Sequence, residues 1–512
     1  MPSYAAVDIG SNSIRMLAAE VTQSGEFRVL AEDRQVTRLG ESVFRSGRLS
    51  PAAIETACNV LAAMAQEYRK HDVVGVRAVG TSALRDASNK AEFLHRAGEA
   101  LGTSVEVISG LEEARLIYLG VHSRWPQNDT SGRTMIIDVG GGSAEIIVGE
   151  GGHLLDAFSK KIGAVRLKEV FLKSDPPTKL ELTQMEEYIG QRLESVVQKL
   201  NVHSYERVIG TSGSAAALVA AVNRISGARR DRVDRSYASF SRVRKFYREV
   251  ATRNLDGRRK TPGIGPRRAE IIVPGVAVLA YVMREFEVKR LQYSAAGLRD
   301  GIIADLARRG VGKEFSRLDS DRRAVAAAMA RRYGVDLQHV RKVAQLGAQL
   351  FDATAVLHKL PPFFGRLLEA AAYLYDIGHF VSDTRHHRHS YYLVANSDLP
   401  GFTERERQIV AHLCRFHRKS MPGPSHLEFQ ALDAESKRSV MFLAPLLRLA
   451  SALDQRHEQH VQSIDCTLLE SQFLVVLHSD PDVKLEQWAG EQVGDVFKQV
   501  YDRQLVITRA RR

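Results

Sequence analysis

Two short segments of the sequence share a pattern of one acid, glycine and small polar residues. Each copy is an apolar run that ends in Asp-x-Gly, continues through a small polar turn and enters a second apolar run. The acids are Asp8 and Asp138, and the turns hold Gly10, Ser11, Asn12 and Ser13 in the first copy and Gly140, Gly141, Gly142 and Ser143 in the second. Such turns leave backbone N–H groups open to an anion. Two facing loops would bind a phosphate chain from both sides, with the carboxylates holding a divalent cation.

Two other interpretations of these loops were weighed. A dinucleotide fingerprint requires that the glycine loop follow a strand and open a helix. Both loops here open into a second β run, so this interpretation is set aside. Two ordinary hairpin turns would explain either copy alone. The pairing of the two copies favours a ligand site.

Two side chains could act on a phosphorus atom. Ser109 and Glu112 fit a capping box in which the glutamate reaches back to the helix start, and this leaves Glu113 free as a general base. Arg85 follows the predicted strand 73–79 and could neutralise charge on phosphoryl oxygens. A helix-dipole role for the acids and a surface ion pair for Arg85 are the alternatives.

A third small-residue loop lies between a predicted strand and a predicted helix. It contains Gly210, Ser212 and Gly213. A helix N-terminus preceded by such residues is suited to an anion or a nucleotide. A fourth loop at 294–301 is explained equally well by close helix packing.

The order of predicted elements repeats. Strand 27–37, a helix from Ser50-Pro51 to about 70, strand 73–79, helix 89–101, strand 104–108 and helix 111–122 follow the first hairpin. Strands 134–138, 143–149 and 153–161, helix 178–200, strand 206–210, a helix from 213, strand 289–293 and a helix from 298 follow in the second half. Two βββαβαβα halves predict an α/β protein with the duplicated ribonuclease-H-like core of the actin, sugar-kinase and Hsp70 group. The ligand would lie between the halves.

The C-terminal part predicts different structure. Helical periodicity dominates from about 312, and β-like runs occur at 473–477 and 505–508. We therefore expect four domains: 1–122 and 123–308 as the ribonuclease-H-like halves, an α-helical domain at 312–440, and a small α+β appendage at 441–512.

Bulk properties limit the possible classes. No window approaches 18 uninterrupted apolar residues, and no basic stretch followed by an apolar one opens the chain, so we expect a cytoplasmic protein without a membrane span. The three cysteines show no CxxC spacing and predict neither a disulfide framework nor a thiolate zinc site.

The net charge of +12 is concentrated in one segment. Residues 224–268 contain fifteen Lys or Arg against four acids. The segment is either a solvated helical insertion or a basic wall along the path of a phosphate chain. No nucleic-acid motif accompanies it, so we expect no nucleic-acid partner.

Taken together, the motifs resemble the exopolyphosphatase / guanosine pentaphosphate phosphatase family. They are Asp8 to Ser13, Thr81 to Arg85, Ser109 to Tyr118, Asp138 to Glu145, Gly210 to Gly213 and Gly297 to Gly301. The resemblance extends to the long, four-domain members through His386 to Ser390 and Asn396 to Phe402.

The resemblance implies magnesium-dependent hydrolysis of a terminal phosphoanhydride. It implies Glu113 as the base, Arg85 as the transition-state cation, and Asp8, Asp138 and Glu145 as magnesium ligands, directly or through water. The backbones of both glycine loops would bind phosphate. It also implies that the helical domain is similar to the HD phosphohydrolase fold. The His-Asp dyad of that fold reads Tyr375-Asp376 here, so the neighbouring histidines are expected to be structural or part of a basic surface.

We expect a processive exopolyphosphatase that acts on inorganic polyphosphate. The first alternative is removal of the 5′ γ-phosphate from guanosine pentaphosphate, and the second is a weakly catalytic polyphosphate or alarmone sensor. A sugar kinase is disfavoured because no sugar-binding acid is evident. The resemblance further implies a homodimer.

Overall fold

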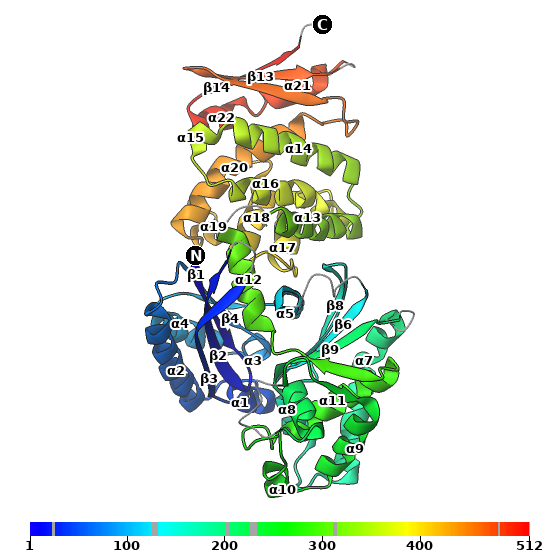
Figure 1. The fold of residues 1–512 in the computed structure, drawn as a ribbon. Helices are drawn as coiled ribbons and strands as arrows, with labels where there is room; N and C mark the ends of the chain where they lie inside the picture. Colours follow the sequence, from blue (N-terminus) through cyan, green and yellow to red (C-terminus); the bar gives the residue numbers. More distant parts are fainter. Residues whose placement is uncertain are drawn as a thin grey trace. The chain divides into compact units, whose positions relative to one another are not determined.

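The chain forms two compact units, Met1–Gly312 and Lys313–Arg512 (Figure 1). A computed structural model describes residues 1–22, 26–124, 132–200, 204–225, 233–310, 315–479 and 482–510. Further divisions at 122/123 and 440/441 stay predictions. Among the described residues, no helix is long and apolar enough to cross a membrane.

The first half of the first unit is built on a five-stranded sheet in the order β3-β2-β1-β4-β5. Its strands are β1 (Ser3–Ile9), β2 (Ser13–Val21), β3 (Phe27–Val36), β4 (Gly75–Gly80) and β5 (Val105–Val107). Its helices are α1 (Leu39–Ser46), α2 (Pro51–Arg69), α3 (Ser82–Asp86), α4 (Lys90–Leu101) and α5 (Gly110–Arg124). The central strand β1 is antiparallel to β2 and parallel to β4. This arrangement brings the β1–β2 turn and the end of β4 to the same edge of the sheet.

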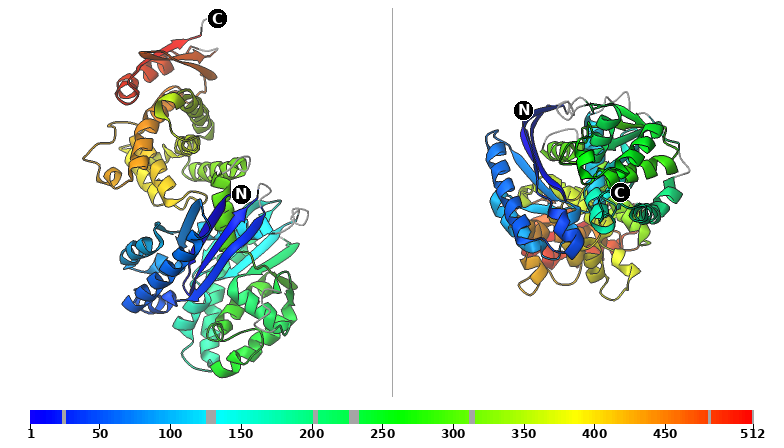
Figure 2. Two further views of the ribbon diagram at one scale, coloured as in Figure 1. Left: turned by 60° about the vertical axis from the view of Figure 1, so that its left-hand side comes forward. Right: turned by 90° about the horizontal axis from the view of Figure 1, so that it is seen from below.

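The second half repeats this arrangement within a six-stranded sheet in the order β10-β11-β9-β6-β7-β8 (Figure 2). Its strands are β6 (Thr134–Val139), β7 (Ala144–Glu150), β8 (His153–Lys160), β9 (Arg207–Thr211), β10 (Tyr237–Ser239) and β11 (Arg290–Tyr293). Its helices are α6 (Ala164–Phe171), α7 (Lys179–Leu200), α8 (Ser212–Val222), α9 (Phe240–Ala251), α10 (Leu255–Arg259), α11 (Ile272–Glu285) and α12 (Leu298–Gly310). Strands β8, β7, β6, β9 and β11 correspond in order to β3, β2, β1, β4 and β5. The duplicated α/β core is therefore confirmed.

Five elements of this unit were not predicted: α1, α3, α6, β10 and α11. Helices α9 and α10 lie in the basic segment, for which a helical insertion was one of two interpretations. Tertiary contacts position the shortest of these elements. For example, the first N–H groups of α6 bind carbonyl oxygens of the distant turn between β6 and β7: Ala164 N lies 2.9 Å from Gly140 O, and Val165 N lies 2.8 Å from Gly141 O. No local sequence pattern carries that information.

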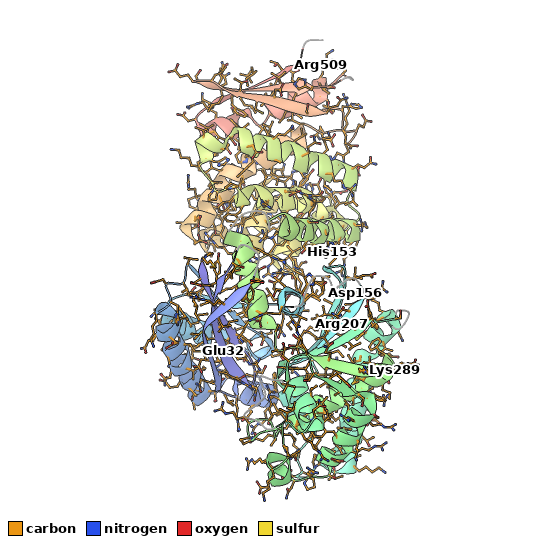
Figure 3. The ribbon with its side chains drawn as sticks, viewed as in Figure 1. Glu32, His153, Asp156, Arg207, Lys289 and Arg509 are labelled. Atoms are coloured by element: carbon orange, nitrogen blue, oxygen red, sulfur yellow. The ribbon has the colours of Figure 1, made fainter. Side chains whose placement is uncertain are left out.

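Strand β1 is buried on both faces, because its alternate residues pack against helices on opposite sides of the sheet. Ala5, Val7 and Ile9 join the core beneath α2 and α4, whereas Tyr4 and Ala6 pack with residues of α12. Helix α12 comes from the end of the second half, so the two halves share a core. Its Arg299 donates to the carbonyl oxygen of Met16 at 2.9 Å and to Glu32 of β3 at 2.6 Å; Glu32 is labelled in Figure 3.

Helices α5 and α12 cross with their backbones in contact. A Cβ atom at Gly120 would lie 2.1 Å from Gly297 O, and one at Gly301 would lie 1.8 Å from Leu116 O. Both positions therefore require glycine. The fourth small-residue loop of the sequence is explained by this helix packing.

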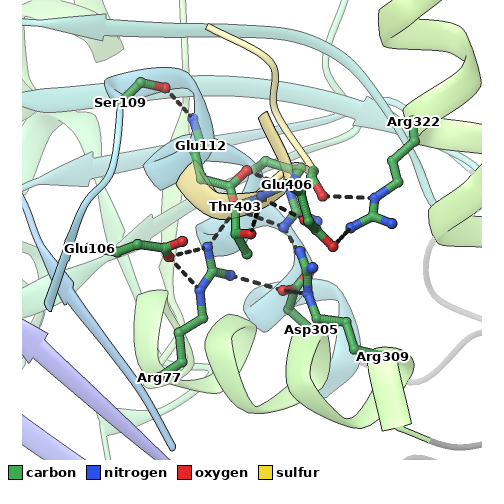
Figure 4. Close-up of polar contacts among 11 residues, drawn as sticks. Arg77, Glu106, Ser109, Glu112, Asp305, Arg309, Arg322, Thr403 and Glu406 are labelled. Atoms are coloured by element: carbon green, nitrogen blue, oxygen red, sulfur yellow. Dashed lines mark hydrogen bonds and ion pairs between the residues drawn. The ribbon is translucent and has the colours of Figure 1, made fainter. Parts of the chain in front are cut away.

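A buried ion network holds the same crossing (Figure 4). Asp305 of α12 is fully buried and accepts from Arg77 at 2.8 Å, Arg115 at 2.7 Å and Arg309 at 2.6 Å. Glu112 accepts from Arg115 at 2.7 and 2.9 Å. Ser109 Oγ does accept from Glu112 N, at 3.1 Å. The Glu112 carboxylate, which we expected to complete the capping box, is instead part of this ion network.

The second unit is mainly helical, with a three-stranded sheet in the order β12-β13-β14. Its helices are α13 (Phe315–Arg332), α14 (Leu337–Ala353), α15 (Ala355–His358), α16 (Phe363–Leu374), the 3-10 helix η4 (Ile377–Phe380), α17 (His386–Ala395), α18 (Glu404–Phe416), α19 (Leu427–Gln430), α20 (Ala434–Ala452), α21 (Lys484–Glu491) and α22 (Gly494–Tyr501). Its strands are β12 (Ser463–Leu468), β13 (Gln472–His478) and β14 (Gln504–Arg509). One hydrophobic core includes Leu350, Leu447, Phe473 and Phe497, so the sheet packs on the helices. The helical region and the two β runs are confirmed, while the HD-like identity stays a prediction.

Candidate functional site

The two glycine loops lie against each other in the first unit. Each closes a hairpin with the same hydrogen bond, from Gly10 N to Ser13 O at 3.2 Å and from Gly140 N to Ser143 O at 3.0 Å. A Cβ atom at Gly141 would lie 2.9 Å from the Ser11 Cβ atom and 3.3 Å from Asn12 N. The loops therefore approach as closely as they do because position 141 has no side chain.

Strand register places a second charged residue opposite each predicted acid. Asp138 is opposite Glu145, and Asp8 is opposite Arg15. Asp8, Asp138 and Glu145 are all buried. Arg15 was not among the predicted site residues. It occupies the same cross-strand position in the first hairpin as Glu145 does in the second. A comparison of the two copies position by position would have found it.

The pKa values of the acids in this cluster are raised, which indicates that their negative charge is not balanced by nearby cations. Burial, partly offset by Arg15, raises the pKa of Asp8 from 3.8 to about 6. Burial and the nearby charge of Glu113 raise the pKa of Asp138 from 3.8 to about 7. The same two causes raise the pKa of Glu145 well above its usual value. Four carboxylates around one buried space are therefore incompletely neutralised by the protein's own cations.

Glu145 also carries an unsatisfied atom. Ser159 donates to its Oε1 at 2.7 Å, while its Oε2 is buried and has no hydrogen-bond partner among the described residues. Oxygen ligands with excess negative charge are what a hard divalent cation such as Mg²⁺ prefers. The donor set therefore fits that class of ion.

Arg85 and Glu113 form an ion pair at the edge of this cluster. Arg85, on α3, donates from Nη1 to Glu113 Oε2 at 2.8 Å and to the Ile108 carbonyl oxygen at 3.0 Å. Its Nη2 donates to Ser143 Oγ at 3.3 Å. One guanidinium thus connects the N-terminal end of α5 with the second glycine loop. Sequence analysis named Arg85, Glu113 and Ser143 separately, and the fold brings them together.

The loop at 210–213 lies beside the same acids. Ser212 has φ 67°, a left-handed conformation that is uncommon for a serine. Its hydroxyl donates to the carbonyl oxygen of Val139 at 2.8 Å, next to Asp138. The Arg268 guanidinium covers Gly213, where a Cβ atom would lie 1.9 Å from Arg268 Nη2. Arg268 comes from the basic segment and is a second site residue that sequence analysis did not single out.

Several polar atoms around the loops are buried without a partner among the residues that the structure describes. They are Ser11 Oγ, Asn12 Nδ2 and Ser214 Oγ. Buried polar groups are normally satisfied by protein, water or ligand. Ser11 and Asn12 belong to the first glycine loop, so a polar ligand held there could satisfy their unpartnered atoms.

The remaining basic segment is mostly solvent-exposed. Helix α9 packs Val243, Phe246 and Val250 inward, and its cations Arg242, Arg244, Lys245 and Arg248 are exposed. By contrast, Arg258 is buried and pairs with Asp175. Arg229, Arg230, Asp231 and Arg232 lie outside the described residues. The segment thus combines a solvated helix face with one arginine, Arg268, at the candidate site.

Comparisons with known proteins agree with this site. The sequence model of the Ppx/GppA phosphatase family matches residues 17–309, and that of Ppx/GppA phosphatase, domain III, matches residues 322–487. A guanosine-5′-triphosphate,3′-diphosphate pyrophosphatase of Vibrio vulnificus (strain YJ016) is 28% identical over 90% of this chain and 88% of its own length.

Two solved structures are similar to about three fifths of this chain. An exopolyphosphatase-like protein is 28% identical with a TM-score of 0.57 and covers 60% of this chain and 98% of its own. The Aquifex aeolicus member of the Ppx/GppA family is 29% identical with a TM-score of 0.53 and covers 61% of this chain and 99% of its own. Because the family model spans more than half of the sequence, the chain belongs to the Ppx/GppA phosphatase family and is a hydrolase that acts on phosphoanhydride bonds.

Proposed function

We propose that the protein removes the terminal 5′ phosphate of guanosine 5′-triphosphate 3′-diphosphate by attack of water. The observation that carries the reaction is the Arg85–Glu113 pair, at 2.8 Å, beside two facing phosphate-binding loops. The guanosine substrate is supported by the name of the Vibrio vulnificus relative, which is similar over 90% of this chain. This was the first alternative from the sequence, and the comparisons favour it over the polyphosphate prediction.

Glu113 is the proposed general base. It lies in the first turn of α5, and its carboxylate accepts a hydrogen bond from Arg85. A carboxylate in that position can orient a water and take its proton as the oxygen attacks the terminal phosphorus. Arg85 then stabilises the negative charge that develops on the phosphoryl oxygens. The hydrogen bonds of Arg85 to Ile108 O and Ser143 fix its guanidinium before substrate arrives.

The loops are proposed to bind the phosphate chain through backbone N–H groups. In the second loop the carbonyl oxygens of Gly140 and Gly141 already accept from α6, and the carbonyl of Gly142 accepts from Arg166 at 2.8 Å. These contacts hold the loop in one conformation before the ligand binds. Less conformational entropy of the loop is therefore lost on binding. Arg268 over Gly213 would add a fixed cation on the side of the 210–213 loop.

Asp8, Asp138 and Glu145 are the proposed ligands of Mg²⁺, directly or through water. When bound, the ion would neutralise phosphate charge and polarise the phosphoryl group. Those three side chains supply the negative charge that attracts the ion. Arg15 lowers the pKa of Asp8 and of Asp138, and Ser212 lowers that of Asp138, so both groups favour the ionised carboxylates. In this proposal the three acids bind the ion, and Glu113, held by Arg85, accepts the proton of the attacking water.

A processive exopolyphosphatase is the second candidate. The exposed cations of α9 and the name of the exopolyphosphatase-like structural relative favour it. A sensor without turnover is less favoured, because a binding protein needs no positioned base. The cytoplasmic location and the homodimer stay predictions.

Phosphate release tests these candidates directly. The protein is assayed with Mg²⁺ on guanosine 5′-triphosphate 3′-diphosphate and on long-chain polyphosphate in parallel. Glu113→Gln is the test variant, and Glu99→Gln, whose side chain is 68% exposed on α4, is the matched control. We expect release from the nucleotide to exceed that from the polymer, to fall by about 10²–10⁴-fold in Glu113→Gln, and to be unchanged in Glu99→Gln.

Three results would change the conclusion. Faster turnover of the polymer would favour the exopolyphosphatase. Binding without release in the wild type would favour the sensor. Near-normal turnover by Glu113→Gln would remove Glu113 as the base.

A further inference from the structure

Three acceptor atoms converge inside the second unit, far along the chain from the phosphatase site. They are Nε2 of His386 at the start of α17, Nε2 of His417 just after α18, and Oδ1 of Asp376 between α16 and η4. The two imidazole nitrogens are 3.3 Å apart, and they lie 3.7 and 3.9 Å from Asp376 Oδ1. These three separations place a point about 2.1 Å from every one of the three atoms, which is the usual bond length from a nitrogen or oxygen ligand to zinc.

The tautomers of both histidines are set by backbone carbonyl groups. Nδ1 of His417 lies 2.8 Å from the Cys414 carbonyl oxygen, and Nδ1 of His386 lies 3.3 Å from the Asp383 carbonyl oxygen. A carbonyl oxygen only accepts, so Nδ1 carries the proton in each ring and Nε2 presents a lone pair. Metal-bound histidines characteristically donate their other nitrogen in this way.

Without a cation, this arrangement is unfavourable. Two lone pairs and a carboxylate oxygen face one another in a site where His386 is 4% and His417 is 7% exposed. A divalent ion at the point equidistant from the three atoms would accept all three lone pairs and so remove the conflict.

Other charged groups lie nearby and were considered. Arg418 Nη1 is 3.3 Å from Nε2 and 3.4 Å from Nδ1 of His386. Arg418 is exposed to solvent, so its side chain can move away from His386 when an ion binds. The His379 ring stacks on His386 with centroids 3.7 Å apart, and its Nε2 lies 3.7 Å from Asp376 Oδ1.

A second group around Asp376 is less suitable. His339 and His457 also lie near this carboxylate. However, His339 Nδ1 contacts Asp454 Oδ2 at 2.8 Å, and its Nε2 contacts the Tyr375 hydroxyl. Both nitrogens of that ring are engaged. Tyr375, which stands in place of the histidine of the expected dyad, thus engages His339. It leaves His386 and His417 available beside Asp376.

We propose that Asp376, His386 and His417 bind one divalent transition-metal ion of the zinc class, with a water or an external ligand in the remaining position. Two imidazoles and one carboxylate suit zinc, iron or manganese better than magnesium, which prefers oxygen ligands. The site is independent of the acid cluster in the first unit and of the proposed phosphatase activity. Metal bound here stabilises the second unit, because the unfolded chain does not hold the three ligands together.

The test uses the full chain, prepared without an affinity tag that binds metal. The apoprotein is titrated with Zn²⁺ in the presence of excess Mg²⁺, and bound metal is quantified after dialysis. Co²⁺ is added in a parallel sample, because imidazole and carboxylate ligands in a tetrahedral site give visible absorption. The variants are His417→Gln and His386→Gln. His389→Gln, on the same helix α17, and Asp138→Asn, in the first unit, are controls.

We expect one Zn²⁺ per chain in the wild type and in both controls, with a raised unfolding temperature. Each ligand variant should bind Zn²⁺ at least about 100-fold more weakly, the upper range for changes that only reorient a ligand, and lose the Co²⁺ spectrum. Far-UV circular dichroism confirms that the variants are folded, and His386→Asn is used in place of any variant that is not. Equal zinc binding by the wild type and folded ligand variants would overturn the proposal, as would its loss in Asp138→Asn alone.

Discussion

Asp138→Asn should stabilise the protein in the absence of divalent ions, at a cost in activity. The pKa of Asp138 rises from 3.8 to about 7, chiefly through burial and the charge of Glu113. Each pKa unit corresponds to about 1.36 kcal/mol, so ionising this carboxyl in the folded chain costs about 4 kcal/mol. Removing one charge also lets the neighbouring acids ionise more readily, so we expect about half of that gain, ~2 kcal/mol.

The sign of the pH dependence follows from linkage. A carboxyl whose pKa is higher in the folded than in the unfolded chain binds its proton more tightly when folded. Its effect on stability therefore becomes unfavourable as pH rises from about 4 to about 7. At pH 8 the variant should be more stable than the wild type. Near pH 5 Asp138 is protonated in the folded protein, so the difference should largely disappear.

Thermal unfolding measures this effect. In EDTA at pH 8, ~2 kcal/mol corresponds to an increase of about 4 °C for a unit of this size. The same comparison at pH 5.5 should give a much smaller increase, and Mg²⁺ at pH 8 should raise the unfolding temperature of the wild type more than that of the variant. A variant that is less stable at pH 8, or a difference equal at both pH values, would refute the electrostatic reasoning.

Three other substitutions test separate parts of the structure. Arg85→Lys keeps the charge but cannot make the three hydrogen bonds of the guanidinium, so kcat should fall about 100-fold; unchanged kcat in a phosphate-release assay would argue against transition-state stabilisation. Gly163→Ala would place a Cβ atom 2.4 Å from the Gly142 nitrogen, so urea unfolding should show a loss of about 1–3 kcal/mol; Gly494→Ala, with open space around it, is the matched control, and equal effects would contradict the packing argument. Asp305→Asn leaves the buried Arg77 and Arg115 and the partly exposed Arg309 without their shared carboxylate and should cost about 3–5 kcal/mol at pH 7; a loss below 1 kcal/mol by the same method would show that the network contributes little.

The strands and longer helices predicted in the first half of the first unit agree closely with the structure. Each predicted strand and helix between residues 27 and 124 has a counterpart whose ends differ by one or two residues, as for helix 89–101 against Lys90–Leu101. Hydrophobic period, N-caps and glycine turns act over a few residues, so the sequence contains them directly. The elements that were missed, such as α6, depend on hydrogen bonds to another part of the chain.

The candidate site could be predicted as separate pieces. The turn residues of both hairpins, and Glu113 and Arg85, carry recognisable residue types. Arg15 and Arg268 carry no such signal, because an arginine in a strand or in a basic loop is most often at the surface. Their proximity to Asp8 and Gly213 is visible only when the sheet register and the segment after α10 are known.

The duplicated hairpins, the order of most α/β elements and the resemblance to the family follow from residue type and short spacing, so they can be predicted without a structure. Three contacts are visible only in the folded chain: Gly141 lies against Ser11, Arg85 bridges Glu113 and Ser143, and His386 lies near His417 and Asp376. Each of these contacts joins segments that are 28 to 130 positions apart or that belong to different helices or turns. Burial, strand register and helix crossing bring these segments together, and all three are properties of the whole packed chain.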